Sequence, residues 1–301
     1  MLAFSSLLGN VEGQNIYRIW YDKPASYWEE ALPVGNGRIA AMVFGDPQLE
    51  QIQLNEETVS AGSPYQNYNE EAKTALPEMR RLIFEGKYEE AQNMAATKIL
   101  SQVGNEMPYQ TVGRLNIRYQ DHKKVNNYYR DLDISNAVAV TRYEVDGVEF
   151  TEETFASFTD QLVIRHIKAS KPGTINCELF FNTPMRDPKR SIYGKKGLRL
   201  EGITHGSRYF PGKVHYCADL DVKHKGGKVI TANDTLLSVQ GASELTLYIS
   251  MATNFVNYKD ISGDPYQRNK AYLKNAAKDY SKAKAAHIAC LLYTSPSPRD
   301  L

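Results

Sequence analysis

Short runs of β-branched and aromatic residues, separated by Gly, Asn, Asp and Pro, constrain the fold of this chain most strongly. The clearest case lies between residues 137 and 158, where apolar and polar side chains alternate on both sides of Asp146-Gly147. Both central positions of a two-residue type I′ turn require a positive φ, so Asp-Gly between alternating runs predicts a β-hairpin. Short runs of this composition, separated by turn residues, are typical of antiparallel sheets.

Further apolar runs predict more strands. Residues 38–45 form a short run bounded by glycines, as expected for a buried strand. A second hairpin is expected at Gly226-Gly227, between strands at residues 219–224 and 228–231. The remaining expected strands share a β-branched and aromatic composition; they cover residues 161–169, 174–182, 198–203, 235–240 and 244–251.

One helical segment interrupts the strands. Residues 70–102 are rich in Ala, Glu, Lys, Leu and Met, which are strong helix formers. Pro77 suits a first helical turn and Gly86 suits a helix end, so two helices are predicted. Apolar residues after Gly86 recur at helical spacing, and we expect this helical hairpin to pack on the sheets.

The two ends of the chain depart from the strand pattern. Residues 1–14 resemble the remnant of a secretory signal peptide, and a loose apolar arm is the alternative. Residues 263–289 predict a polar linker helix with a narrow apolar stripe. Residues 290–301 contain two Ser-Pro steps and are interpreted as a non-native tail, with a native Pro-rich linker as the alternative. The fold class is therefore all-β: a large antiparallel β super-sandwich over residues 15–262, with a helical-hairpin insert and a carboxy-terminal linker helix.

Composition excludes several classes of partner. The 36 basic and 35 acidic residues give a formal net charge of +1, whereas nucleic-acid binding needs a concentrated basic excess. No apolar run reaches the length of about 18 residues that a membrane span requires. The three cysteines form no CxxC pair and the six histidines show no paired spacing, so neither a metal site nor a cofactor is expected.

Candidate functional residues lie in residues 28–45 and 53–58. Gly35-Asn36-Gly37 predicts a tight turn followed by Arg38, and Asn55-Glu56 places an amide and a carboxylate at a strand end. Turn glycines and solvated glutamates are common in β proteins, so the residues alone favour a structural role over a binding site.

The order of several segments resembles the amino-terminal domain of family 95 glycoside hydrolases, the α-L-fucosidases. The likeness covers about residues 15–289; it rests on Trp28 and on residues 31–38, 53–58, 107–113, 128–132, 155–161 and 252–260. Two departures are Val59 to Pro64, where family members often carry Trp and Gly, and Arg114, where an acidic residue is common.

The resemblance implies an activity and an architecture. Family members are exo-acting and inverting; they release terminal L-fucose from glycans, and some relatives act on L-galactose. Their catalytic residues lie in an (α/α)6 barrel that follows the linker, so no catalytic residue is assigned to this chain. The expected partners are a fucosylated oligosaccharide or a plant or host glycan, and the barrel in cis; the expected location is extracytoplasmic, either periplasmic or secreted.

The resemblance also makes Asn36, Arg38, Asn55 and Glu56 candidates for contact with substrate or with the barrel, and we expect these loops to face the barrel rather than bulk water. Two alternatives remain open at this stage. One is a free-standing carbohydrate-binding or structural β-sandwich, and the other is a related enzyme such as an α-L-galactosidase or a disaccharide phosphorylase.

Overall fold

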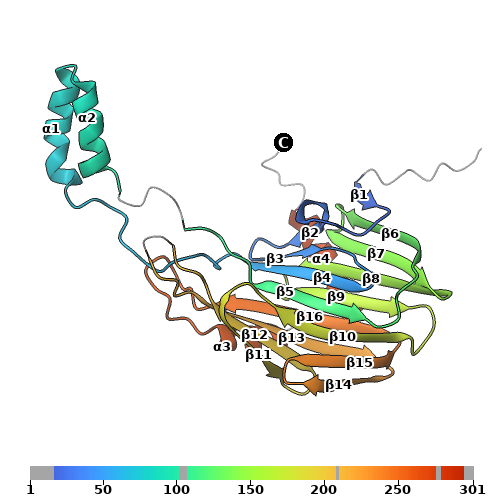
Figure 1. Ribbon diagram of the computed structural model, residues 1–301. Helices are drawn as coiled ribbons and strands as arrows, with labels where there is room; N and C mark the ends of the chain where they lie inside the picture. Colours follow the sequence, from blue (N-terminus) through green and yellow to red (C-terminus); the bar gives the residue numbers. More distant parts are fainter. Residues whose placement is uncertain (1–16, 102–106, 208–209, 276–278, 295–301) are drawn as a thin grey trace, which may run out of the picture.

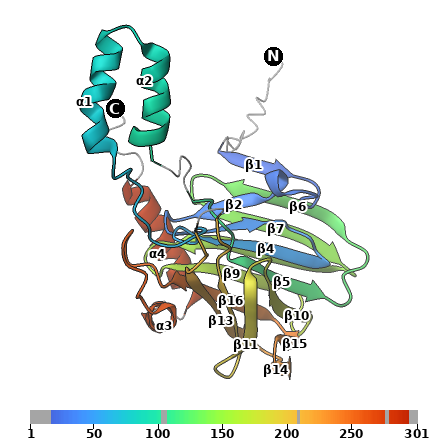
Figure 2. The ribbon, with the colours of Figure 1, turned by 60° about the vertical axis from the view of Figure 1, so that its left-hand side comes forward.

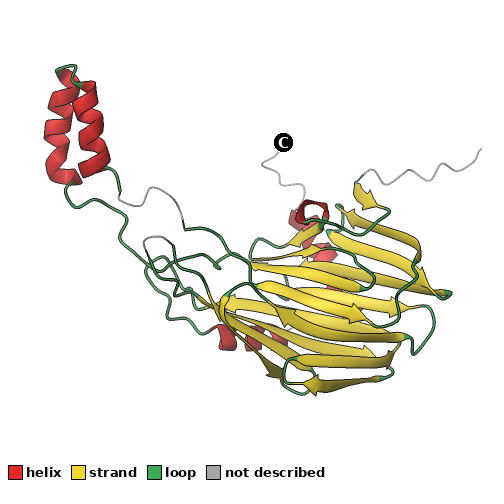
Figure 3. Ribbon diagram, viewed as in Figure 1, coloured by secondary structure: helices red, strands yellow, loops and turns green. Residues whose placement is uncertain are grey.

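Two antiparallel β-sheets face each other and form a sandwich, as expected (Figures 1 and 3). The computed structural model describes residues 17–101, 107–207, 210–275 and 279–294. The first sheet has nine strands. In spatial order they are β1 (Arg18–Tyr21), β6 (Asn126–Asp133), β7 (Val138–Val145), β8 (Val148–Ser157), β9 (Leu162–Ala169), β16 (Glu244–Thr253), β13 (His215–Lys225), β12 (Gly197–Ile203) and β11 (Arg186–Tyr193).

The second sheet has seven strands and packs its inner face against the first. In spatial order they are β14 (Lys228–Asn233), β15 (Leu236–Ala242), β10 (Ile175–Asn182), β5 (Gly113–Tyr119), β4 (Leu49–Glu56), β3 (Ile39–Val43) and β2 (Leu32–Gly35). Successive side chains of a strand point to opposite faces, so alternate apolar residues of both sheets meet in one shared core.

The two predicted hairpins have different outcomes. The turn at Asp146-Gly147 is confirmed: φ is 50° and 74°, and it joins β7 to its neighbour β8. The hairpin at Gly226-Gly227 is wrong, because β13 pairs with β12 and β16 whereas β14 pairs with β15 in the other sheet. Two positive φ angles at Gly226 and Gly227 carry the chain from one sheet to the other. A Gly-Gly step permits either path.

The helical insert stands away from the sandwich. It consists of α1 (Ala72–Phe84), α2 (Tyr88–Met94) and the π-helical turn η2 (Ala95–Ile99). Figures 1 and 2 both show α1 and α2 projecting beyond the end of the strands, so the prediction that they pack on the sheets is wrong. The apolar stripe is used within the hairpin itself, where Ala75, Leu82 and Ala91 are buried.

The ends of α1 test two further predictions. Gly86 ends the helix as predicted: its N–H bonds to Ile83 O, and the N–H of Lys87 bonds to Leu82 O. Pro77 lies inside α1 and not in its first turn. The helix begins five residues before Pro77, because Ala72 to Leu76 carry good helix formers that outweigh the proline signal.

The linker prediction is wrong in one respect: the described residues form two helices, α3 (Pro265–Asn275) and α4 (Tyr280–Thr294). Both lie against the outer face of the nine-stranded sheet (Figure 2). Asn269 of α3 is fully buried, accepting from Ser250 Oγ and donating to Cys217 O. A polar side chain of this helix, which the sequence predicts to be exposed to solvent, therefore binds the sheet.

The predictions for the two ends of the chain are tested only in part. Helix α4 continues to Thr294, so residues 290–294 of the predicted tail are helical, because no helix-breaking residue occurs before the first Ser-Pro step. The remainder of that tail, residues 295–301, and the predicted signal remnant at residues 1–14 lie outside the described residues. A short 3-10 turn, η1 (Trp28–Glu30), precedes β2.

Candidate functional site

The loops that follow β4, β12 and β16 gather at one end of the sandwich, beneath the helical insert (Figure 1). We call this the loop end; its described residues are 57–71, 107–112, 204–207, 210–214 and 254–264. Backbone hydrogen bonds hold the loops side by side: Ala61 N to Pro108 O at 2.8 Å, Gly62 N to His205 O at 3.1 Å and Lys213 N to Gly62 O at 2.9 Å. These bonds join three parts of the chain that are far apart in the sequence: residues 61 and 62, residue 108, and residues 205 and 213.

Asn36 is bound within its own turn and across the sandwich. Its Oδ1 accepts from the N–H groups of Arg38 and Ile39, at 3.0 and 2.9 Å, which closes the turn between β2 and β3. Its Nδ2 donates to Ser157 O at 2.9 Å, at the end of β8. Asn36 therefore ties the seven-stranded sheet to the nine-stranded sheet.

Arg38 joins more elements than any other candidate. Its Nε and Nη2 donate to the side chain and backbone of Gln161, at 2.6 and 3.0 Å. Its Nη1 donates to Met251 O at 2.8 Å, and its guanidinium lies 4.5 Å from the ring centroid of Tyr272 in α3. Nη1 also lies 3.6 Å from Glu56 Oε1. The guanidinium thus fixes the turn, β16 and α3 relative to one another.

Glu56 is a buried carboxylate, 4% exposed. Its Oε2 accepts from the backbone N–H and the hydroxyl of Thr58, at 2.8 and 2.6 Å. The Thr58 oxygen in turn accepts from the hydroxyl of Thr253, whose oxygen accepts from Phe255 N at 3.1 Å. Burial raises the pKa of Glu56, while the Thr58 bonds and Arg38 oppose that shift. The carboxylate thereby links β4 to two loops of the loop end.

Asn55 and Glu56 point to opposite faces of their sheet. In β4 the residues Glu50, Ile52, Leu54 and Glu56 are buried, whereas Asn55 belongs to the alternate, half-exposed set. The Asn55 side chain therefore lies on the outer face of the seven-stranded sheet, away from Arg38. The structure brings Asn36, Arg38 and Glu56 together and leaves Asn55 out of the group.

A cavity of about 420 Å³ opens in the loop end beside this group. Thr58 and Phe255 line it, and both are held through the Glu56 and Thr253 bonds. Aromatic side chains of Tyr65 and Tyr258 form further walls, and Glu57 contributes an exposed carboxylate. The candidate residues thus support this cavity from below and do not line it.

Thr58, Thr253 and the aromatic residues that line the cavity were not among the functional residues predicted from the sequence. Their positions in the family resemblance could have indicated them, because Thr58 lies in the segment 53–58, and Phe255 and Tyr258 lie in the segment 252–260. The contact between Thr58 and Thr253 joins residues 195 positions apart. No local spacing encodes such a contact.

Two other carboxylates meet in the core. Arg165 Nη2 binds Glu50 Oε2 at 2.8 Å and also binds Glu152, and all three side chains are almost fully buried. Tyr119 and Tyr143 donate to Glu152 Oε1 at 2.6 and 2.8 Å. Burial raises the pKa of Glu50 to about 7 despite the opposing effect of Arg165. An inverting glycosidase needs room for water between its carboxyl groups, and this sealed cluster offers none.

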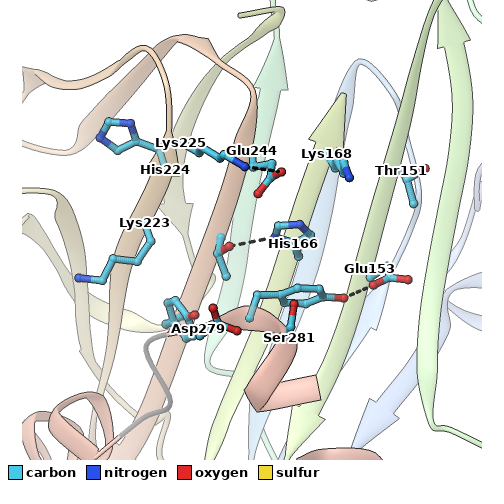
Figure 4. Close-up of a pocket in the computed structure, with 13 residues that line it drawn as sticks. Thr151, Glu153, His166, Lys168, Lys223, His224, Lys225, Glu244, Asp279 and Ser281 are labelled. Atoms are coloured by element: carbon cyan, nitrogen blue, oxygen red, sulfur yellow. Dashed lines mark hydrogen bonds and ion pairs between the residues drawn. The ribbon is translucent and has the colours of Figure 1, made fainter. Parts of the chain in front are cut away.

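A second cavity, of about 520 Å³, lies on the outer face of the nine-stranded sheet beside the start of α4 (Figure 4). Its charged side chains are largely paired. Lys225 Nζ lies 3.4 Å from Glu244 Oε1, and Glu153 accepts from the Tyr280 hydroxyl and from Lys284 Nζ. The two bonds to Glu153 hold the first turns of α4 to β8.

His166 completes this contact. Its ring stacks on Tyr280 with centroids 3.9 Å apart, and its Nδ1 shares a hydrogen bond of 2.9 Å with Thr246. Burial lowers the pKa of His166, so the neutral ring is the form that packs. The second cavity is therefore mainly the seam between α4 and the sheet.

Among the described residues, no three His, Cys, Asp or Glu side chains gather as a metal site would require. None of the described helices combines the length and apolarity needed to cross a bilayer.

Comparisons with known proteins identify relatives of this chain. The chain is 31% identical over 271 residues to Alpha-L-fucosidase 2 of Arabidopsis thaliana, covering 81% of this chain and 31% of that protein. It is 26% identical over 295 residues to Probable alpha-fucosidase A of Aspergillus niger, covering 90% of this chain and 36% of that protein. The chain therefore spans about a third of the length of these relatives.

A solved structure, described as a putative kojibiose phosphorylase from the human microbiome, aligns with a TM-score of 0.49 and 10% identity. That alignment covers 92% of this chain and 38% of the other. The expected likeness to the amino-terminal part of α-L-fucosidases is confirmed by the curated relatives. A sequence model described as Glycosyl hydrolase family 65, N-terminal domain, matches residues 19–258, and the chain belongs to that family.

Proposed function

We propose that this chain is the amino-terminal sandwich of an inverting, exo-acting α-L-fucosidase-like glycoside hydrolase that releases terminal L-fucose from glycans. The observation that carries the proposal is the 31% identity to Alpha-L-fucosidase 2 over 81% of the chain. In this proposal the catalytic acid and base belong to an (α/α)6 barrel in cis, outside the residues of this chain. The sandwich positions and supports that barrel.

The arrangement of carboxylates supports a proposal in which the barrel carries the catalytic residues and the sandwich supports it. Hydrolysis with inversion needs an acid at the leaving oxygen and a base that activates water, about 6.5–9.5 Å apart. Glu50 and Glu152 are sealed in the core, and Glu56 is bonded to Thr58 and Arg38 beneath the loop end. These three carboxylates have structural partners, which supports placing the acid and the base in the barrel.

In this proposal the loop end faces the barrel. Its aromatic and hydroxyl side chains surround a cavity, and the turn at Asn36 and Arg38 fixes α3 beside it. Three residues then act as positioning residues behind this surface: Asn36, Arg38 and Glu56. Asn55 lies on the outer face of the sheet and is a separate candidate for contact with the barrel. The glycan and an extracytoplasmic location follow from the same proposal.

A free-standing carbohydrate-binding sandwich is the second candidate. Trp20 and Trp28 favour it, because their side chains are 61% and 49% exposed, and exposed indole rings stack on sugars. The third candidate is an α-L-galactosidase of the same architecture. An assay of a complete protein that contains this sandwich separates the three.

Such a protein is incubated with 2′-fucosyllactose and with an aryl α-L-galactoside, and the released sugar is followed by proton NMR. We expect fucose to be released first as the β-anomer, and faster than galactose. Release of the α-anomer contradicts inversion, faster galactose release favours the galactosidase, and binding without hydrolysis favours the carbohydrate-binding sandwich.

A further inference from the structure

The cavity of the loop end combines apolar walls with a polar rim. Its walls include the side chains of Tyr65, Phe255 and Tyr258, and its floor includes Met107. Hydroxyl groups of Thr58, Ser60 and Ser63 and the carboxylate of Glu57 stand among them. Ligand sites are typically apolar concavities with a few convergent polar groups, and this cavity has that composition.

The cavity is held in shape without a ligand. Gly62 is fixed on both sides by backbone bonds to His205 and Lys213. Its φ is +82°, a conformation that favours glycine, and a Cβ there would lie 2.8 Å from Met107 Sδ and displace that side chain. Tyr65 stacks on Phe210 with centroids 4.4 Å apart. The floor and one wall are therefore preorganised, which lowers the entropic cost of binding.

Two other aromatic residues of the lining are more exposed to solvent. Tyr258 is 72% exposed, and Lys259 Nζ lies 5.1 Å from its ring centroid. Phe255 is half-buried and is fixed by the bond from its N–H to Thr253. Together with Tyr65, these residues give the cavity three aromatic rings that a ligand can contact. A cavity of about 420 Å³ has room for one or two pyranose rings.

The lining selects the chemistry of the ligand. A pyranose has an apolar face of C–H groups, which aromatic rings contact, and a rim of hydroxyls, which carboxylates and hydroxyls bind. Among the described residues that line the cavity, Glu57 is the one with a charged side chain, and its negative charge disfavours anionic sugars. The apolar side chains of Met107, Val214 and Ile261 suit a methyl group better than a hydroxymethyl group.

We propose that the loop-end cavity of the sandwich itself binds a neutral 6-deoxypyranoside, namely an α-L-fucosyl unit of the glycan. The choice of fucose rests on the proposed function, whereas the presence of a sugar site rests on the cavity. The sandwich then recognises the glycan independently of the chemistry, and Glu56 is a positioning residue of this site through Thr58.

The test uses the purified chain and nitrogen-15 NMR titration with methyl α-L-fucopyranoside. We expect saturable shifts, centred on residues 57–67 and 254–261, with a dissociation constant of about 1–10 mM. Methyl α-L-galactopyranoside, which carries a 6-hydroxyl group, should bind at least about fivefold more weakly. Tyr258→Ala should weaken fucoside binding about fivefold or more. Phe84→Ala, at an 88% exposed ring of α1, is the matched control and should change nothing.

The outcomes separate this inference from the proposed function. Absence of saturable shifts at the loop end, equal binding of the two sugars, or an equal effect of Phe84→Ala overturns the inference. If the chain binds fucoside but a complete protein hydrolyses none, the proposed function fails alone. If a complete protein hydrolyses fucosides but this chain binds none, the inference fails alone.

Discussion

The guanidinium of Arg38 and the carboxylate of Glu56 face each other at 3.6 Å behind the loop end of the sandwich. Arg38 follows the turn between β2 and β3, and Glu56 ends β4, which pairs with β3. The ion pair therefore joins two motifs that are separate in the sequence. Through Tyr272 and Thr58 the pair also reaches α3 and the cavity. Its main role is to fix the geometry of this end of the molecule.

The first prediction compares Glu56 with its neighbour. Glu56→Ala removes the acceptor for Thr58 and leaves the Arg38 guanidinium without its buried partner, so we expect a loss of about 2–3 kcal/mol in the free energy of unfolding. Asn55→Ala is the matched control on the outer face of the same strand and should cost at most about 0.5 kcal/mol. Urea denaturation measures both. Equal effects would contradict the assigned geometry.

The second prediction concerns pH and the core cluster. Glu50 has a pKa of about 7 in the folded chain against 4.5 when exposed, so the folded state binds the proton more tightly. Stability from this group is therefore full below about pH 4.5 and is lost as pH rises through about 7, by an amount on the order of 3 kcal/mol.

Denaturation at several pH values between 4.5 and 8 measures this loss. Glu50→Gln should reduce the pH dependence across that window, whereas Glu149→Gln, at an exposed site, should leave it unchanged. An identical pH profile in the Glu50 variant and the parent would show that another group is responsible.

Much of the fold was predictable because local patterns determine it. The hairpin at Asp146-Gly147 needs only its turn residues and the alternation around them. The path after Gly226-Gly227 was not predictable, since the same backbone freedom serves a hairpin or a crossing between sheets. The packing of α3 on the sheet through Asn269 could not be predicted either, because the sequence does not distinguish a buried asparagine from an exposed one.

The candidate site was predictable only in part. Asn36, Arg38 and Glu56 stand in motifs, and the structure brings them together. Asn55 stands in the same motif, but the two-residue period of a strand sends it to the other face. The supporting contact from Thr58 to Thr253 depends on the topology of both sheets, which no local spacing reveals.

The third prediction concerns α4. His166 and His287 are packed neutral at its interface, and burial lowers the pKa of both. Groups with a lowered folded pKa lose their contribution as pH falls through the unfolded value near 6.5, so α4 should open more readily at about pH 5 than at pH 7.5. Glu153 and Lys284 also face His166. Burial opposes ionisation of Glu153, but hydrogen bonds from Lys284 and Tyr280 lower its pKa below the usual value.

Hydrogen exchange of residues 280–294, corrected for the intrinsic effect of pH, measures this opening. Substituting both histidines by phenylalanine should remove the difference between the two pH values. Protection in the parent that is unchanged at pH 5 would contradict the assignment.

The fourth prediction concerns the helical insert. Because α1 and α2 pack on each other and project from the sandwich, replacing residues 72–99 by a short Gly/Ser linker should change the midpoint of thermal unfolding by no more than about 2 °C. Differential scanning calorimetry of the two proteins tests this. A drop of about 5 °C or more would mean that the insert stabilises the sandwich.

The most direct test of the account is the turnover of 2′-fucosyllactose by the purified chain, measured beside Alpha-L-fucosidase 2 of Arabidopsis thaliana. We expect no turnover by the chain and turnover by the relative. A chimera of the relative, carrying residues 15–289 of this chain in place of its matching segment, should retain kcat/KM to within about tenfold. Turnover by the chain alone at about 1 per second or more would contradict the account, because the chemistry would then lie in the sandwich.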